Sequence, residues 1–309
     1  MSSDLEDARA ALAAIPGFAT RAASAEIARL GGLTNRVFRI GLADQSLCLR
    51  LPGAGTEAYI NRTNEAQAAR AAAAAGVSPE VLHAAPGSGI MLTRFIEGAT
   101  TMSPAFFKSR PGSPARAGAV FRKLHESGAR FDSRFELFAM VDDYLKFLAG
   151  KPVALPDGYH ATLSEAETIR AALAAHPLPI VACHCDPLSE NFLDTGTRMW
   201  IVDWEYSGMN DPMWDLGDLS VEAEFGPAQD AELVAGYFGR PPTPSELGRM
   251  VIYKAMCDLL WTLWGLIQLA NANPADDFKA YAERRFARCR ALMATPEFAA
   301  HIRAVAAGA

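Results

Sequence analysis

The feature that most constrains this chain is a change in the spacing of its apolar residues about a third of the way along it. Between residues 25 and 96, short apolar runs typical of strands surround one Ala-rich helix, which should end at Gly76. From about residue 113 onward apolar residues recur at helical spacing, apart from strand-like runs at 179–185 and 192–205. This pattern predicts an α+β protein of two lobes, with a small antiparallel sheet lobe over 1–96 and a larger, mainly helical lobe over 97–309.

Composition narrows the class of partner. Half of the 309 residues are hydrophobic, which is enough for a sizeable core, and the net charge is -6. Nucleic acid and anionic membranes are disfavoured as partners, because they require clustered Lys and Arg. No run of 18 apolar residues suggests membrane insertion, and the acidic start does not resemble a signal peptide, so we expect a cytoplasmic protein. Five cysteines without a CxxC pair do not form a disulfide framework.

Four polar residues interrupt the strand-like runs of the second lobe. His184, Asp186 and Asn191 have the spacing H-x-D-x4-N, and Asp203 closes the apolar run that follows. Chance gives roughly 0.01 matches to the first three positions in a chain of this composition. The alternative is that these side chains cap turns, as Asp-Pro and Asn often do. That alternative explains Asp203 poorly, because an unpaired carboxylate is costly to bury among apolar residues.

Phosphoryl transfer from ATP gives each of these residues a reason to be present. We predict that Asp186 is the base that orients the acceptor hydroxyl, and that Asn191 and Asp203 bind Mg²⁺ through hard oxygen atoms. His184 belongs to the same catalytic segment, where we expect it to organise the loop by hydrogen bonding.

A cation is then needed in the first lobe to neutralise the phosphates. The chain has no lysine before Lys108, so the candidate is Arg50, inside the apolar run LCLRLP. Glu65 on the following helix is predicted to hold it in a charge-assisted pair. The alternative is an exposed edge-strand arginine that pairs with any nearby acid.

The remaining nucleotide contacts are predicted from a turn and a hinge. Gly32, Thr34 and Asn35 lie in the turn LGGLTNRVFRI, whose backbone could approach phosphates closely, although Gly-Gly between strands is also an ordinary hairpin turn. The main chain that leaves the first lobe is predicted to bind adenine. This hinge consists of Phe95, Ile96 and Glu97.

Two tryptophans point to the kind of acceptor. Trp261 and Trp264 lie three residues apart, on one face of a predicted helix. A quaternary ammonium group cannot donate hydrogen bonds, so a protein recognises it with aromatic faces and a carboxylate. The alternative is that both tryptophans pack in the core.

Taken together, these segments resemble the choline/ethanolamine kinase family, among the aminoglycoside-phosphotransferase-like relatives of protein kinases. The resemblance covers about residues 25–290. It rests on the LRL context of Arg50, on the HxDxxxxN motif, on D-[FW]-E-Y at 203–206 and on D-[IL]-G at 215–217.

The resemblance implies a protein-kinase-like fold and ATP- and Mg²⁺-dependent phosphorylation of a small amino alcohol, with choline first. Glu222 matches an acid that lines the cationic substrate's site in that family, and Tyr281 stands where a further aromatic residue is expected. Tyr206 could join the aromatic cage, and Glu205 could add negative charge to it. Asp218 stands where the family has Asn, which leaves the role of this side chain open.

Three alternatives remain open from the sequence. The acceptor could be ethanolamine or an aminoglycoside, which need carboxylates and hydrogen-bond acceptors more than aromatic faces. A nucleotide-binding pseudokinase that acts as a sensor or scaffold would not need Asp186, Asn191 and Asp203 together. The apolar C-terminal helices could pack within the lobe or form a homodimer.

Overall fold

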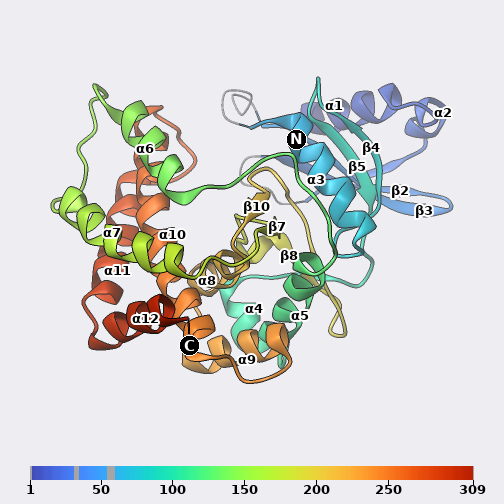
Figure 1. Cartoon of the computed structure of the whole chain (residues 1–309). Coiled ribbons are helices and arrows are strands. Elements are labelled where there is room, and N and C mark those ends of the chain that lie inside the picture. Colours follow the sequence, from blue (N-terminus) through green and yellow to red (C-terminus); the bar gives the residue numbers. More distant parts are fainter. Residues whose placement is uncertain (1, 31–34, 54–59, 309) are drawn as a thin grey trace.

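The computed structural model describes residues 2–30, 35–53 and 60–308. Within these residues, the N-terminal part is built on an antiparallel sheet in the order β1-β2-β3-β5-β4 (Figure 1). Its strands are β1 (Glu26–Arg29), β2 (Arg36–Leu42), β3 (Gln45–Leu51), β4 (Val81–Ala85) and β5 (Ile90–Arg94). Its helices are α1 (Ser2–Ala14), α2 (Ala19–Ala22) and α3 (Arg62–Ala74). The predicted strands and the predicted Ala-rich helix are confirmed, whereas the sequence patterns do not predict α1 and α2.

Alternation along β3 gives this central strand two different faces. Leu47, Leu49 and Leu51 are buried in an apolar cluster that includes residues of α1. Arg50 therefore points to the opposite face, where Glu65 of α3 contacts its guanidinium group. Because β3 pairs with both β2 and β5, Arg50 does not lie on an edge strand.

The ends of α3 follow from local sequence. The side chain of Asn61 accepts hydrogen bonds at 3.1 Å from the backbone N–H groups of the second and third helical residues. Gly76 has a φ of 68°, a conformation that favours glycine, and it ends the helix close to the predicted position. Glu65 is thereby fixed in the first turn of α3, opposite β3.

The rest of the chain is mainly helical, as predicted. Its helices are α4 (Pro104–Ser109), α5 (Ser113–His125), α6 (Leu137–Leu148), α7 (Tyr159–Ala175), η2 (Ser189–Asn191), α8 (Pro212–Glu222), α9 (Pro227–Phe238), α10 (Pro244–Ala270), α11 (Phe278–Met293) and α12 (Pro296–Ala307). Its short strands are β6 (Thr100–Thr101), β7 (Val181–Cys183), β8 (Phe192–Asp194), β9 (Met199–Ile201) and β10 (Gly208–Asn210). The β8–β9 hairpin is the predicted one, while β7 pairs with β10, which the sequence patterns do not predict.

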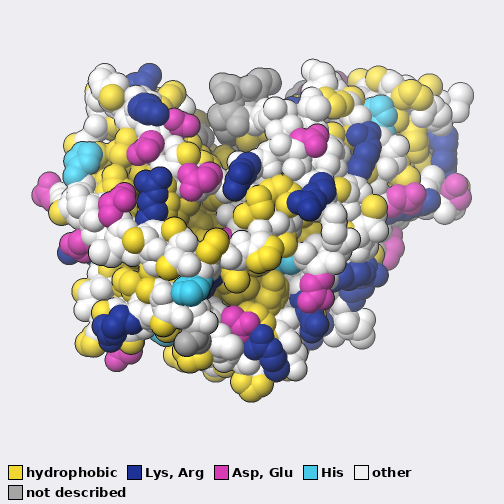
Figure 2. Space-filling view, viewed as in Figure 1, with side chains coloured by type: hydrophobic (Ala, Val, Ile, Leu, Met, Phe, Trp, Pro, Cys, Tyr) yellow, Lys and Arg dark blue, Asp and Glu magenta, His cyan; other side chains and the backbone are white. Residues whose placement is uncertain are grey.

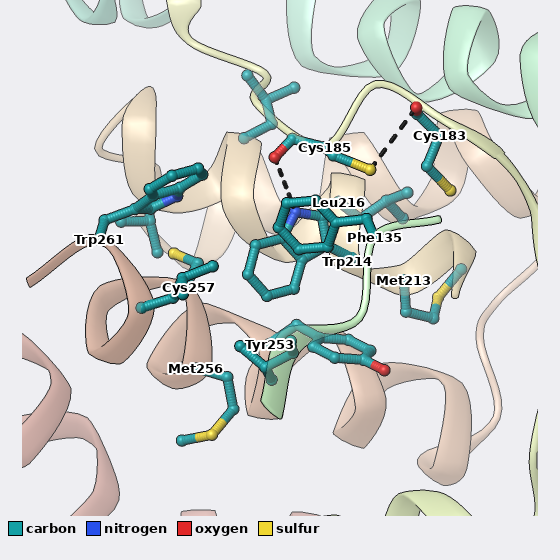
Figure 3. Packing of buried hydrophobic residues seen from close by; sticks show 14 of the residues in the cluster. Phe135, Cys183, Cys185, Met213, Trp214, Leu216, Tyr253, Met256, Cys257 and Trp261 are labelled. Atoms are coloured by element: carbon teal, nitrogen blue, oxygen red, sulfur yellow. Dashed lines mark hydrogen bonds between the residues drawn. The ribbon is translucent and has the colours of Figure 1, made fainter. Parts of the chain in front are cut away.

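Part of the core of the helical part lies against the segment that carries Cys183 and Cys185 (Figure 3). The ring of Trp214 packs against Phe135, with centroids 4.8 Å apart, and against Tyr253 at 5.7 Å. Its indole N–H donates to the carbonyl oxygen of Cys185 at 3.1 Å. This packing anchors the residue before Asp186 from below.

Helix α10 is long and apolar enough to cross a membrane by length and composition, with a mean hydropathy of 1.4 over its most apolar window. That window is 78% buried inside the protein, as in the core helix of a globular domain. It packs against α6, α8, α11 and α12.

Two apolar clusters divide the described residues. The smaller contains residues of α1, α2, β2, β3 and β5. The larger joins the helical part and also takes in Ala68, Ala69 and Ala72 of α3. We retain a lobe boundary near residue 96 as a proposal, with α3 packed against the larger core. Acidic and basic side chains occur over both parts on the face shown in Figure 2.

Candidate active site

The segment before Asp186 is held by one buried carboxylate. The two oxygens of Asp215 accept the backbone N–H groups of His184 and Cys185, each at 2.8 Å. Asp215 also contacts the ring of His125 at 3.0 Å. Cys185 has a φ of 67°, which is unusual for a residue with a side chain and costs about 1–3 kcal/mol. These bonds hold the strained turn that presents Asp186.

Asp186 follows this turn, and no described residue donates a hydrogen bond to its carboxylate. Its backbone carbonyl accepts from Asn191 Nδ2 at 3.0 Å, which brings the predicted base and the predicted metal ligand together. Burial raises the pKa of Asp186 well above its ordinary value, and the charges of Glu222, Asp203 and Glu205 raise it further. A carboxylate with a raised pKa is a stronger acceptor for a hydroxyl proton.

His184 lies in the interior with a structural contact. Its Nε2 is 2.9 Å from the carbonyl oxygen of Val202, the residue before Asp203, and its ring lies 4.9 Å from that of Trp204. Burial lowers the pKa of His184, which favours the neutral ring. The contact joins the two motif segments and agrees with the predicted loop-organising role, while a catalytic role for this ring remains a prediction.

A network of ion pairs joins the sheet to the motif segment at 203–205. Arg50 contacts Glu65 and lies 3.4 Å from Asp203 and 3.6 Å from Glu205. Arg62, which sequence reasoning did not single out, bonds Glu65 at 2.9 Å and Glu205 at 2.5 Å. The predicted Arg50–Glu65 pair is therefore present, and the side chain of Arg50 is only 11% exposed. The alternative of an exposed edge-strand arginine is wrong.

The structure corrects the group to which Glu205 was assigned. Its Oε1 accepts from Asn35 Nδ2 at 2.8 Å and contacts both arginines, so it lies in the ion-pair network of Arg50 and Arg62 rather than against the aromatic rings. The positive charges of Arg50 and Arg62 and the side-chain amide of Asn35, all from the N-terminal part, stabilise the carboxylate of Glu205 in this position. Asn35 is buried by this contact, and Gly32 and Thr34 of the same turn lie outside the described residues.

The residues near Asp203 fit a magnesium ion. Asp203 has a φ of 68° and one carboxylate oxygen within 4.8 Å of oxygens from Glu65 and Glu205. Burial and the charge of Glu205 raise the pKa of Asp203 to about 7, so a cation at this point would be favoured. Asn191 uses its amide nitrogen on Asp186, which leaves its Oδ1 without a described donor. This set of hard oxygens is what Mg²⁺ prefers.

The hinge predicted to bind adenine keeps most of its main-chain groups. The backbone N–H of Phe95 donates to the carbonyl oxygen of Ser46 at 3.1 Å, so only the carbonyl oxygen of Phe95 is left for a nucleotide. Among described residues, the N–H groups of Ile96 and Glu97 have no backbone partner, so adenine binding by Phe95, Ile96 and Glu97 stays a prediction. Arg50 has two buried nitrogens, Nε and Nη2, without a described hydrogen-bond acceptor, as a phosphate-binding side chain requires.

The predicted cage residues form one aromatic group. The rings of Tyr206 and Trp261 lie 5.7 Å apart, those of Trp261 and Trp264 6.4 Å, and those of Trp264 and Tyr281 5.6 Å. The indole N–H of Trp264 donates to the hydroxyl oxygen of Tyr206 at 3.2 Å. Trp261 is buried, so core packing accounts for part of its role, while the other three are partly exposed.

Charged residues adjoin this aromatic group. Burial raises the pKa of the Tyr281 phenol against the opposing charge of Arg285, and the charges of Glu222, Asp186 and Asp218 raise it further. Asp218 is fully buried, and the indole N–H of Trp261 points between its two oxygens at 3.4 Å from each. The predicted base, the predicted cage and the acid expected from the resemblance are thus brought together.

Four residues of this site were not singled out as site residues from the sequence. Asp215 belongs to the quoted D-[IL]-G segment, which was a usable signal, and Arg62 stands three residues before Glu65 on a helix. Burial raises the pKa of the Tyr144 phenol on α6, and the charge of Asp186 raises it further. Arg285, on α11, gave no sequence signal of its own.

Comparison with known proteins identifies the class. The model of the phosphotransferase enzyme family matches residues 26–250, so the chain belongs to this family. A crystal structure of a choline/ethanolamine kinase family protein from Mesorhizobium loti is 67% identical to the chain, with a TM-score of 0.92, and the match covers 99% of this chain and 100% of that one. Within the phosphotransferases, the chain is a member of the choline/ethanolamine kinase family.

More distant relatives agree with this placement. Protein LicA of Haemophilus influenzae is 27% identical over 267 residues, which are 83% of this chain and 76% of LicA. A crystal structure of LicA in complex with AMP is 25% identical, with a TM-score of 0.70, and the match covers 87% of this chain and 91% of that one. The predicted family and the predicted kinase-like fold are confirmed.

Proposed function

We propose that this protein transfers the γ-phosphoryl group of ATP to the hydroxyl group of choline, with Mg²⁺, and releases phosphocholine and ADP. The sheet part up to about residue 96 would bind the nucleotide, and the helical part would supply the base and the acceptor site. The single observation that carries the choice of acceptor is the aromatic group next to Asp186.

The acceptor site suits an organic cation. Four aromatic residues, Tyr206, Trp261, Trp264 and Tyr281, provide faces for methyl groups, each contact contributing about 0.5–2 kcal/mol. Glu222 supplies the opposite charge close to them. Family membership supports an amino alcohol, since the relative from Mesorhizobium loti is named for choline and ethanolamine.

The chemistry follows from the placement of Asp186. Its carboxylate has no described donor, so it is available to accept a hydrogen bond from the acceptor hydroxyl and then its proton as the oxygen attacks phosphorus in line. The proton leaves the hydroxyl for Asp186 as the new P–O bond forms, and ADP departs. The burial and neighbouring carboxylates that raise the pKa of Asp186 favour this proton transfer.

The phosphates would be neutralised from the opposite side. Arg50 is held by Glu65 and keeps two nitrogens for phosphate oxygens. Asn191 and Asp203 would hold Mg²⁺, which when bound offsets the negative charge on the phosphates. Burial opposes the charge of Arg50, but Glu65, Asp203 and Glu205 outweigh it and raise its pKa, so it stays a cation.

A coupled ADP-release assay with Mg-ATP tests this function. The acceptors are choline, dimethylethanolamine, ethanolamine and kanamycin, compared by kcat/KM. We expect choline to lead ethanolamine by about tenfold or more, which corresponds to about 1.4 kcal/mol of transition-state preference. Ethanolamine in the lead would keep the kinase and reject the aromatic cage as the selective element. ATP binding without turnover of any acceptor would reject the enzyme and support the pseudokinase alternative.

A further inference from the structure

Arg285 is a buried cation that lies against the acceptor site. Its side chain is 7% exposed and contacts the carboxylate of Glu222 directly. It also lies 3.2 Å from Asp258 Oδ1, and its guanidinium group stacks 4.9 Å from the ring centroid of Tyr281. Arg285 thus connects α8, α10 and α11 at the point where the acid and one aromatic residue of the proposed site meet.

Glu222 needs such a partner. It is the last residue of α8, where the partial negative charge of the helix end disfavours a carboxylate. Asp218 lies one turn earlier on the same helix, a spacing at which like charges repel. The carboxylate of Asp186 is close enough for Glu222 to contribute to its raised pKa. Without a cation nearby, this carboxylate would be driven to turn away from the site.

Arg285 is itself held in a fixed orientation. Asp258 accepts hydrogen bonds from Arg288 Nε and Nη2, both at 2.6 Å, in addition to its contact with Arg285. Asp258 is therefore held by both Arg285 and Arg288. The ring of Tyr281 packs against the guanidinium group of Arg285 and limits the orientation of its plane. A planar guanidinium group set in this way orients the carboxylate that it contacts.

We propose that Arg285 is a positioning residue that holds the carboxylate of Glu222 aimed at the ammonium group of the acceptor. This inference rests on the proposed function. It assigns Arg285 no contact with the reacting atoms, and it makes the affinity for a cationic acceptor depend on a residue outside the aromatic cage.

A double-mutant cycle tests this role. We expect Arg285→Gln and Glu222→Gln each to raise the KM of the preferred amino alcohol by about 30-fold, as expected for removal of one partner from a buried charge pair, with the KM of ATP changed less than twofold. Because one residue acts through the other, the double variant should be no worse than Glu222→Gln alone. The neutral isostere 3,3-dimethyl-1-butanol, as substrate or inhibitor, should lose less than about threefold in Arg285→Gln.

Two further variants separate positioning from folding. Arg288→Gln removes the other arginine from Asp258 but leaves the direct contacts of Arg285 with Glu222 and Asp258, so it should raise the acceptor KM clearly less than Arg285→Gln does. Arg285→Lys keeps the charge but not the planar fork that orients Glu222, so it should recover only part of the loss seen in Arg285→Gln. Thermal unfolding of each variant checks that the compared proteins are folded.

The outcomes distinguish this inference from the proposed function. Additive losses in the double variant, an equal loss for the neutral alcohol, or an equal loss in Arg288→Gln would overturn the role of Arg285 while wild-type turnover of amino alcohols stands. A wild-type enzyme that phosphorylates no amino alcohol would overturn both together.

Discussion

Replacing Asp215 by Asn tests how the catalytic turn is held. The two carboxylate oxygens each accept one backbone N–H, from His184 and from Cys185. An amide has a single oxygen, so one buried N–H loses its acceptor and faces an NH₂ group instead. We expect the variant to fold, to be less stable, and to turn over slowly.

The magnitude follows from these contacts. A buried N–H group left without an acceptor costs about 1–3 kcal/mol. The left-handed backbone conformation of Cys185 costs a similar amount, and the hydrogen bond from Cys185 to Asp215 helps to stabilise it. We therefore expect Asp215→Asn to lower the free energy of unfolding by about 3 kcal/mol. For a chain of 309 residues this corresponds to a fall in Tm of about 5 °C. Displacement of Asp186 by about 1 Å should lower kcat about 100-fold.

The assay measures thermal unfolding, kcat and the Kd of Mg-ATP. The Kd should change less than about twofold, because Arg50 and Asp203 do not contact Asp215.

Asp218→Asn is the matched control, three residues on in the same helix and equally buried. Burial and the charges of Glu222 and Asp186 raise the pKa of Asp218 above its unfolded value, so its contribution to stability is present at low pH and falls as the pH rises. Asp218→Asn should therefore raise Tm at pH 8, by about 2 °C or more, and not at pH 4. Equal stability of Asp215→Asn and the wild type would refute the reasoning.

Three further predictions concern the proposed roles. Asp186→Ala should lower kcat by orders of magnitude with ATP affinity nearly unchanged, and wild-type activity in this variant would exclude the base assignment. Trp264→Ala should raise the KM of choline more than that of ATP, and the reverse ranking would return this tryptophan to the core. Mg-ATP binding should weaken at low pH as Asp203 takes up a proton, and Glu205→Gln should move the midpoint of this loss to lower pH. The reason is that Glu205 helps to raise the pKa of Asp203 to about 7. A midpoint that stays or rises when the Kd of Mg-ATP is measured against pH would contradict this prediction.

The sequence predicted those parts of the site that depend on residue type and local spacing. Three features could be predicted in this way: the H-x-D-x4-N motif, the arginine in LCLRLP and the tryptophan pair. Each lies within one short segment, so the periodicity of that segment shows which of its side chains share a face. The strand runs and the long helices followed from the same periodicity. The family resemblance supplied Glu222 and Tyr281, which no local pattern distinguishes.

What the sequence could not predict depends on contacts between distant elements. Glu205 was predicted to add negative charge to the acceptor site, but Asn35 and Arg62, some 140 residues or more earlier, hold it in the ion-pair network with Arg50. The backbone N–H of Phe95 donates to the carbonyl oxygen of Ser46, and this contact is set by the register between β3 and β5. Arg285 becomes relevant only because α8 and α11 meet, and one-dimensional spacing carries no information about that meeting.

The packing of α3 has a consequence for how this enzyme could open and close. Its alanines belong to the larger apolar cluster together with Met91 of β5, so α3 packs against the sheet as well as against the helical part. A rotation of the sheet and α3 together against the helical part would leave the Arg50–Glu65 contact closed. It would have to break the contacts of Arg50 with Asp203 and of Arg62 with Glu205, so these two contacts would report the position of the sheet directly.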